Sequence, residues 1–497
     1  MQTGSARRPN IIVMLSDDQG AWAMGCAGNP EIITPNLDRM AAAGVRFENF
    51  FCTSPVCSPA RASLLTGRIP SQHGIHDFLG GGNMGPDAVE YLAGQKGYTD
   101  FLAEAGYVCG LSGKWHLGDS RRPQKGFSHW YAHQGGGGPY YNAPMIRDGE
   151  PVTEEGYLTE RITDDALDFL ETVAGRGQDG EAGGMQAGGK QPFYLSVHYT
   201  APHAPWISNH PREFVELYAE CAFASCPQEP VHPWNIDPEH GFNRSRENLM
   251  GYFASITAMD FHIGRILDKV EALGIGSETL LVFLSDNGHS CGQHGYWGKG
   301  NTTFPLNMYD TSVKVPAIFC WPGGFPAGRV SQAMVSGYDF MPTLLEAAGQ
   351  ADPEAEKLPG RSFLSVLQGE AEQVRGEVVV FDEYGPVRMI RTREWKYVHR
   401  YPFGPHELYD LVQDPGEREN LIGRGDQAEL AAGLRERLDR WFIRYVDPAL
   451  DGLREEVTGK GQLSPAGLAG RGKPAYNGHV DPGFVLTWPQ KHGKAGE

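Results

Sequence analysis

A cysteine, a proline and an arginine lie at a spacing that can support covalent chemistry, in the segment Cys57-Ser58-Pro59-Ala60-Arg61. Pro59 fits the first turn of a helix, and the residues that follow it form helix readily, so Cys57 is predicted at a helix N-terminus. Free N–H groups and the helix dipole favour negative charge there. Arg61, one turn further on, could point back and stabilise an oxyanion at residue 57. The alternative is an ordinary small apolar cysteine near a surface ion pair.

Acidic and amide side chains follow two predicted buried strands. Asp17 and Asp18 follow the first strand of the chain, and Asp286 and Asn287 follow a later one. Because the carboxyl ends of parallel strands share one edge of a sheet, we expect these four side chains to meet. Oxygen ligands of this kind suit calcium or magnesium better than zinc. Either pair alone could equally be a turn-forming cluster, but together they predict a cation site.

Lysine and histidine side chains follow other predicted strands. Lys114 and His116 are two residues apart, which places both on one face of an extended chain. Pro202 and Pro205 flank His203 and restrict the backbone that carries its imidazole. Histidine is the side chain best suited to move protons near neutral pH. The alternatives are core or surface residues and a rigid surface turn.

The glycine-rich segment 292–300 follows the second acidic pair and carries His294 and Lys299. Together with the motifs at 17–18, 57–68, 113–118, 199–206 and 286–287, it resembles the signature of the type I, formylglycine-dependent sulfatases of the alkaline phosphatase superfamily. Segment 407–421 is similar to the C-terminal subdomain of that family, so the resemblance covers roughly residues 9–445. Asp310 and Lys314 depart from it, because relatives more often have Glu and Arg there, and we assign both a structural role.

The resemblance implies a modified nucleophile and a metal. Cys57 would be oxidised to Cα-formylglycine by a formylglycine-generating maturation enzyme, and its hydrate would attack sulfur. The cation would be Ca²⁺ rather than Mg²⁺. Its ligands would be Asp17, Asp18, Asp286, Asn287 and an oxygen of residue 57.

The resemblance also implies the roles of the basic residues. Arg61 would activate the nucleophile with the metal, while Lys114, His203 and Lys299 would bind the sulfate. His203 or Lys299 would protonate the leaving oxygen. His116 would deprotonate the second hydroxyl of the hydrate, which releases sulfate. Loss of such a base typically lowers the rate ~10²–10⁴-fold. His294 would touch the substrate.

The resemblance thus predicts hydrolysis of a sulfate monoester, with a saccharide sulfate favoured and a small aryl sulfate possible. Segments 131–141 and 206–234 are rich in aromatic residues and are candidates to line the substrate pocket, although many aromatics are simply core. Two alternatives stay open. One is a phosphonate monoester or phosphodiester hydrolase of the same superfamily, and the other is a non-catalytic sulfoglycan-binding relative.

Composition bounds the partners and the compartment. The chain of 497 residues has a formal charge of −18, which excludes nucleic acid and anionic membranes as expected partners. No apolar run approaches the ~20 residues that span a bilayer. The N-terminal residues run into the first strand without room for a secretory signal, so a cytoplasmic protein is expected. The eight cysteines form no dense disulfide framework; Cys221 and Cys226 are close enough to pair, although nothing requires it.

The elements alternate as in an α/β fold, with a large, mostly parallel or mixed sheet flanked by helices. Strands are predicted at 10–16, 107–111, 193–199, 279–285 and 315–321, and helices at 36–43, 98–105, 157–174 and 247–273, with a flexible loop at 175–190.

The pattern changes after about residue 367. Short alternating segments at 377–381, 388–391 and 395–399 predict a small antiparallel sheet, and a helix is predicted over 427–445 with Asp426 as its N-cap. We therefore expect a catalytic domain over 1–367, a smaller C-terminal α+β subdomain over 368–446 and an irregular tail over 447–497.

Overall fold

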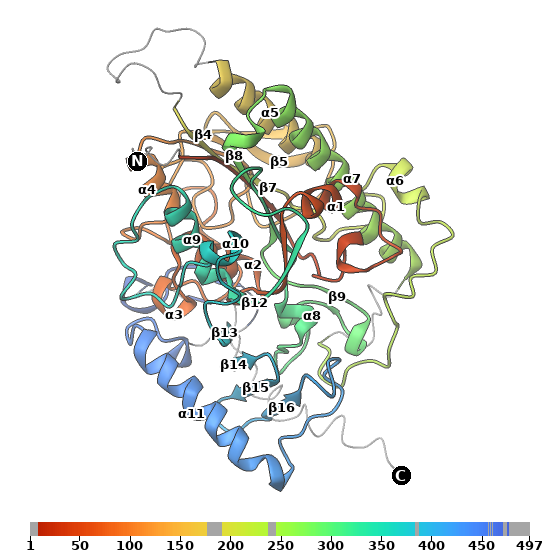
Figure 1. The fold of residues 1–497 in the computed structure, drawn as a ribbon, viewed down its shortest axis with the longest axis vertical. Coiled ribbons are helices and arrows are strands. Elements are labelled where there is room, and N and C mark those ends of the chain that lie inside the picture. The colour runs from red at the N-terminus through yellow and green to blue at the C-terminus, as the bar shows by residue number, and fades with distance from the viewer. Residues whose placement is uncertain are drawn as a thin grey trace.

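A large mixed sheet flanked by helices, with a small antiparallel sheet below it, makes up the computed structural model (Figure 1). The structure describes residues 8–175, 191–236, 245–382, 387–455, 457, 459, 461–470 and 475–476. The predicted loop at 175–190, apart from its first residue, and most of the tail beyond 470 lie outside the described residues. The predicted fold class is confirmed.

The main sheet has ten strands. They are β1 Asn10–Ser16, β2 Val45–Phe51, β3 Val108–Lys114, β4 His129–His133, β5 Ala143–Arg147, β6 Glu150–Glu154, β7 Phe193–His198, β8 Thr279–Ser285, β11 Ala317–Cys320 and β12 Arg329–Ser336. Their order is β12-β2-β11-β8-β1-β7-β3-β4-β5-β6. The central run from β8 to β4 is parallel, whereas β11, β5 and β6 run antiparallel to their neighbours.

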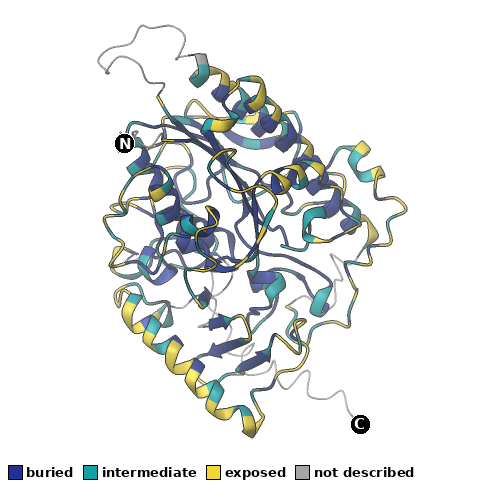
Figure 2. Ribbon diagram, viewed as in Figure 1, coloured by how far each residue is buried: buried dark blue, intermediate teal, exposed yellow. Residues whose placement is uncertain are grey.

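The central strands are mostly apolar and buried because both faces of the sheet are covered. In β1, Ile11, Val13 and Leu15 pack into one core cluster, and Ile12 and Met14 pack into the other. This alternation follows from the period of two along a strand. The dark strands through the middle of Figure 2 show the same burial.

Helices cover both faces of the sheet (Figure 1). One face is covered by α1 Pro35–Ala42, α5 Leu158–Gly175 and α7 Arg246–Ala272. The other is covered by α2 Cys57–Thr66, α4 Tyr98–Glu104, α9 Phe340–Ala347 and α10 Leu364–Leu367. The short helices are α3 Pro70–His73, α6 Arg212–Glu216 and α8 Asp310–Val313, and a two-stranded ribbon pairs β9 Ser290–Cys291 with β10 Trp297–Gly298.

The predicted antiparallel sheet is present after residue 367. Its strands are β13 Glu377–Asp382, β14 Val387–Thr392, β15 Trp395–Arg400 and β16 Glu407–Asp410, and α11 Ala428–Tyr445 packs against it. Asp426 is not the N-cap of α11, because it lies in a preceding 3₁₀ turn where its carboxylate accepts from Arg424. Asp310 accepts from Arg391 and Lys396, so it joins the main sheet to this subdomain.

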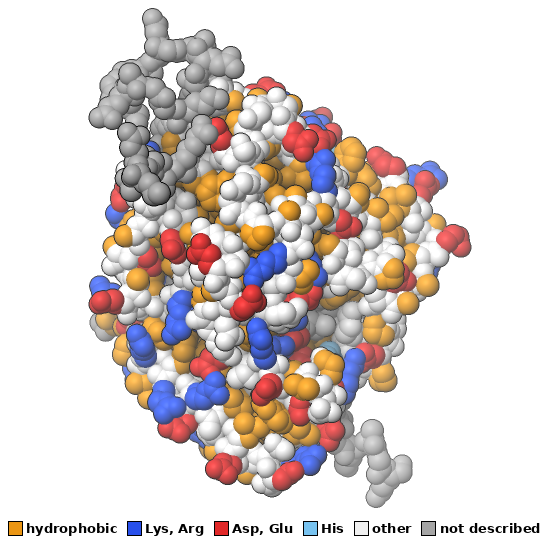
Figure 3. Space-filling model, in the orientation of Figure 1, with side chains coloured by type: hydrophobic (Ala, Val, Ile, Leu, Met, Phe, Trp, Pro, Cys, Tyr) orange, Lys and Arg blue, Asp and Glu red, His pale blue; other side chains and the backbone are white. Residues whose placement is uncertain are grey.

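Described residues of the tail contact the loop that follows α3. Gln462 pairs with Leu79 in an isolated bridge, and its side chain donates to the carbonyl of Gly74. The free thiols of Cys221 and Cys226 show that they are not paired here. Within the described ranges, no helix is both long and apolar enough to cross a bilayer. On the face drawn in Figure 3, acidic and basic side chains are interspersed.

Candidate active site

Four parallel strands end at the same edge of the sheet and carry the predicted residues there. Ser16 at the end of β1 lies beside Ser285 at the end of β8, so the acidic pairs that follow are neighbours. On the other side of β1, His198 of β7 lies beside Gly113 of β3. Lys114 and the loop that carries His203 therefore reach the same edge.

Asp17, Asp18, Asp286 and Asn287, four of the five predicted metal ligands, form one buried cluster. Asn287 Nδ2 donates to Asp18 Oδ1 at 2.7 Å, and the main-chain N–H of Asp18 donates to Asp286 Oδ1 at 3.2 Å. Single carboxylate oxygens of Asp17, Asp18 and Asp286 all lie within 4.8 Å of one another. The buried Oδ1 of Asn287 has no hydrogen-bond partner.

This donor set fits a hard divalent cation. Three carboxylates so close together repel one another, and an amide oxygen without a partner is costly to bury. A cation bound between them would relieve both costs, and oxygen-only ligands are those that calcium and magnesium prefer. The residues that the sequence predicted as ligands therefore lie together. The contacts of Asp18 and Asn287 are the ones that support a cation site.

Cys57 is the first residue of α2, a helix whose residues are all buried. Its Sγ lies 3.3 Å from Asp17 Oδ1, and the Nζ of Lys299 donates to it at 2.7 Å. Burial, reinforced by the charge of Asp17, raises the pKa of the Cys57 thiol to about 12. Burial and Asp17 thus disfavour a thiolate at this position.

Basic side chains balance the carboxylates. Lys114 pairs with Asp17, Lys299 Nζ lies 2.5 Å from Asp18 Oδ1, and Arg61 Nε donates to Asp286 Oδ2 at 2.9 Å. Arg61 also donates to the carbonyl of Lys114. Each of these three cations thus reaches the cluster, and Arg61 divides its hydrogen bonds between the Asp286 carboxylate and the Lys114 carbonyl.

The ionisation of the cluster follows from these pairs. Burial alone would raise the pKa of Asp17, but Lys114 and the other nearby cations hold it well below its usual value. The pKa of Asp286 is raised to about 6 by burial and by Asp17. Burial would lower the pKa of Lys299, yet Asp18 and its other anionic neighbours raise it well above its usual value. Lys299 therefore remains a cation.

The two histidines predicted to transfer protons are anchored through different ring nitrogens. His203 donates through Nδ1 to the carbonyl of Ala204 at 2.7 Å, which leaves Nε2 facing Asp18 Oδ2 at 3.8 Å. His116 donates through Nε2 to the carbonyl of Leu79 at 3.2 Å, and its buried Nδ1 has no partner. Burial, with Lys114 and Arg61, lowers the pKa of His116 well below its usual value. A neutral His116 therefore keeps a lone pair on Nδ1.

His294 is not brought to the cluster. Its ring stacks on Tyr309 at 3.8 Å, and its main-chain N–H donates to Glu229. These contacts lie towards the C-terminal subdomain, where Arg418 pairs with the same Glu229. The geometry gives the predicted substrate contact of His294 no support.

Aromatic residues of the predicted pocket segments brace the His203 loop. The hydroxyl of Tyr140 donates to the carbonyl of His203, and the indole of Trp206 donates to the carbonyl of Pro202. Both aromatic side chains are buried. The residues of these segments that lie against the imidazoles of His116 and His203 are instead Gly136 and Gly137.

Two further histidines lie at this edge, and the sequence pattern did not identify His133. It ends β4, and its buried Nε2 has no partner among the described residues. His289 follows Asn287 closely and stacks on Tyr252, and neither of its ring nitrogens has a partner among the described residues. No sequence signal marked His133, because β4 was not predicted and only its parallel pairing with β3 places it beside Lys114.

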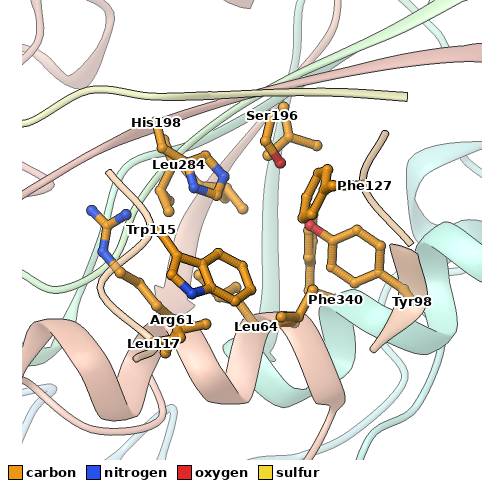
Figure 4. Close-up of a pocket in the computed structure, with 13 residues that line it drawn as sticks. Arg61, Leu64, Tyr98, Trp115, Leu117, Phe127, Ser196, His198, Leu284 and Phe340 are labelled. Atoms are coloured by element: carbon orange, nitrogen blue, oxygen red, sulfur yellow. The ribbon is translucent and has the colours of Figure 1, made fainter. Parts of the chain in front are cut away.

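A pocket lies behind the cluster, on the core side of Arg61. Arg61, Trp115 and His198 line it together with apolar residues of the strands and of α2, α4 and α9 (Figure 4). Its lining belongs to the hydrophobic core. It is therefore a gap in packing beneath the site and not the substrate entrance.

Asp18 and His116 have positive φ angles of 64° and 54°. Residues other than glycine rarely adopt this conformation, and such strain is concentrated at functional sites. Here it follows directly after strands β1 and β3, where the backbone must turn sharply to aim side chains at one point.

Comparison with known proteins decides the family. The family model described as Sulfatase matches residues 9–350. The chain belongs to the sulfatase family. A second family model, for the C-terminal part of N-sulphoglucosamine sulphohydrolase, matches residues 292–443 of this sulfatase. The prediction of a type I sulfatase of the alkaline phosphatase superfamily, and hence of an enzyme, is confirmed.

Similar proteins act on different sulfate esters. The sulfatase is 27% identical to an N-acetylglucosamine-6-O-sulfatase of Bacteroides thetaiotaomicron, over 90% of its own chain and 88% of the relative. It is 28% identical to a choline-sulfatase of Rhizobium meliloti, over 90% of both chains. A solved structure of a protein with its substrate D-glucosamine-2-N,6-O-disulfate superposes with a TM-score of 0.74 and 26% identity, covering 90% of this sulfatase and 100% of that chain.

Proposed function

We propose that this sulfatase hydrolyses a sulfate monoester on a carbohydrate, using formylglycine made from Cys57 and a divalent cation, with calcium favoured. The observation that carries the proposal is the position of Lys299, whose Nζ contacts both residue 57 and Asp18. It joins the nucleophile position to the carboxylate cluster. A separation of 2.7 Å is at the short end of the range for N–H···O bonds, so it suits an oxygen at residue 57 better than a sulfur.

The protonated thiol of Cys57 supports the modification. A thiol whose pKa is raised by burial and by Asp17 is a poor nucleophile, although Lys114 and Lys299 beside it favour an anion. Formylglycine would supply a hydrated aldehyde whose hydroxyl attacks sulfur. A cation between the carboxylates and Asn287 would supply Lewis acidity at that hydroxyl.

The chain's own residues hold the negative charge of the sulfate. Lys114 and Lys299 are buried cations fixed by Asp17 and Asp18, so they need not reorganise as charge develops. Arg61 holds Asp286 in place through Nε. A fixed array of cations in a buried site is the arrangement that most strongly stabilises a developing oxyanion.

The two histidines divide the proton transfers. His203 is partly exposed, with 31% of its side chain accessible, and its Nε2 faces the cluster, so it can protonate the alcohol that leaves. His116 is buried and neutral, with a free lone pair on Nδ1. It can therefore accept the proton of the second hydroxyl on residue 57, whose loss re-forms the aldehyde and expels sulfate. One water is consumed overall, and the products are an alcohol and inorganic sulfate.

Relatives favour a sugar as the alcohol. An N-acetylglucosamine-6-O-sulfatase and a protein whose substrate is a glucosamine disulfate are similar to this chain over 90% of its length. A choline-sulfatase is similar over the same share, so choline sulfate is the competing small substrate.

A panel of substrates tests this proposal. Sulfate release is measured from sulfated glucosamine and galactosamine, choline sulfate, an aryl sulfate and an aryl phosphonate monoester, with wild type and Cys57→Ala. We expect the highest kcat/KM on a sulfated amino sugar and none with Cys57→Ala. Preference for the aryl phosphonate would overturn the sulfatase assignment of the site, and binding of sulfated sugars without turnover would support a non-catalytic protein.

A further inference from the structure

Four consecutive glycines cross the two catalytic imidazoles. They follow β4 as the segment Gly135–Gly138, which we call the glycine strap. A methyl group on Gly136 would lie 2.2 Å from Cε1 and 2.5 Å from Nε2 of His116. A methyl group on Gly137 would lie 3.1 Å from Nδ1 and 3.2 Å from Cε1 of His203. The backbone of the strap thus lies directly against both rings.

The two outer glycines of the strap differ from the inner ones. A methyl group on Gly135 would meet no atom within 4 Å, and one on Gly138 would lie 3.8 Å from Nε2 of His133, an ordinary contact. None of the four glycines has a positive φ. An alanine is therefore compatible with the backbone at every position, and only the space beside the imidazoles requires glycine at 136 and 137.

Each imidazole has one hydrogen bond among the described residues. His116 donates through Nε2 and His203 donates through Nδ1, while Nε2 of His203 also faces Asp18. A ring with one such bond can still swing about its χ angles unless a surface packs against it. The strap supplies that surface for His116, since a methyl group on Gly136 would lie close to Cε1 and to both ring nitrogens.

We propose that Gly136 and Gly137 are positioning residues, which fix the imidazoles of His116 and His203 in their catalytic orientations. The inference rests on the proposed function, because it assigns these two histidines to proton transfer. Gly136 acts on the base that frees sulfate, and Gly137 acts on the acid that protonates the leaving oxygen. Glycine is required at these two positions because the backbone beside the imidazoles leaves no room for a side chain.

An alanine series along the strap tests the proposal. Misplacing a catalytic group by about 1 Å can cost roughly 10²-fold in rate, so Gly136→Ala is expected to lower kcat by about that factor with little change in KM. Gly137→Ala is expected to lower kcat less, because its contact is longer. The matched controls Gly135→Ala and Gly138→Ala should stay within about twofold of wild type, as for an ordinary surface change.

A double-mutant cycle separates positioning from general damage. Gly136→Ala should cause no further loss in a His116→Ala background, because the ring that it displaces is gone. The pH dependence of kcat should shift in Gly136→Ala and stay unchanged in Gly135→Ala. Equal losses in all four alanine variants, or additive losses in the double variant, would overturn the proposal.

A measurement without turnover keeps the inference separate from the proposed function. With ring ¹³C-labelled histidine, the Cε1–Hε1 resonance of His116 is assigned from its loss in His116→Gln. It should move in Gly136→Ala and stay in place in Gly135→Ala and Gly138→Ala. If wild type lacks sulfatase activity but the resonance moves, the packing role stands and the proposed function fails; an unmoved resonance rejects the packing role.

Discussion

Lys299 donates a hydrogen bond to the sulfur of Cys57, with Nζ 2.7 Å from Sγ and 2.5 Å from Oδ1 of Asp18. Cys57 and Lys299 are 242 positions apart in the chain. They meet because α2 begins beneath the edge where β1 and β8 end, and the segment after β10 brings Lys299 over it. This contact joins the proposed nucleophile position to the proposed cation site.

Replacement of Lys299 tests that contact. Lys299→Ala removes a buried cation that faces the transferring group, and the loss of one such donor typically costs ~10²–10³ in kcat. Lys96→Ala, which removes an exposed lysine paired with Glu104, serves as the control and should leave kcat unchanged. Steady-state kinetics on the best substrate of the panel measure both. A kcat for Lys299→Ala within twofold of wild type would contradict the role.

Metal removal tests the carboxylate cluster. Chelation should abolish activity and lower the melting temperature, because the three carboxylates then lose the cation and only Lys114, Lys299 and Arg61 offset their mutual repulsion. Restoring calcium at about 100 times its Kd should return about 2.7 kcal/mol of stability, and magnesium should restore less. Asn287→Ala should weaken calcium affinity, whereas Asn49→Ala, at a half-buried asparagine that donates to Gln332, should not. Full activity of the chelated protein would refute the cation site.

Buried histidines predict a loss of stability in acid. Burial lowers the pKa of His210 to about 3 and those of His133 and His289 to about 4, from an ordinary value of 6.5. Below pH 6.5 the unfolded chain binds protons that the folded chain does not, so stability falls as pH decreases from 6.5 towards 4. Above pH 6.5 these residues contribute no pH dependence.

His210 offers a way to check this sign. It lies away from the cluster, where its Nδ1 accepts from the hydroxyl of Tyr157. The slope of the unfolding free energy against pH reports how many more protons the unfolded chain binds. His210→Gln should lower that number by up to one between pH 6 and 4, as measured by urea unfolding. An unchanged slope, or a steeper one, would show that His210 is protonated in the folded state.

Gln462 is predicted to support the active site from the C-terminal segment. Its Nε2 donates to the carbonyl of Gly74, and its Oε1 accepts from the main-chain N–H of His76. The loop that it holds includes Leu79, whose carbonyl accepts from His116. Gln462→Ala should cost about 1–3 kcal/mol through lost buried hydrogen bonds and should lower kcat. The exposed Gln413→Ala is the control, and equal behaviour of the two variants would contradict this support.

The site was predictable where chemistry follows strand ends. Asp17, Lys114 and Asp286 each lie at or directly after a strand with a clear apolar run, and the shared edge of a parallel sheet then brings them together. The other site residues were predicted from the family motifs. Periodicity and turn residues are local signals and do not say which strands are neighbours. The pairing of β1 with β8 and β7 decides that.

Other features depend on contacts that sequence patterns do not encode. The strand at Ala317–Cys320 was expected, but its antiparallel direction is set by pairing with β2 and β8, and β2 itself was not predicted. The pairing of Gln462 with Leu79 spans almost the whole chain. His294 carries a family-like motif, yet stacking on Tyr309 holds it elsewhere. Tertiary packing decided each of these.

The mass of the peptide that contains residue 57 tests the central claim most directly. Conversion of Cys57 to formylglycine exchanges sulfur for oxygen and lowers that mass. Across preparations that differ in the extent of conversion, the account predicts that kcat rises in proportion to the converted fraction and extrapolates to zero for the thiol. Full turnover by protein in which Cys57 remains an unmodified thiol would contradict it.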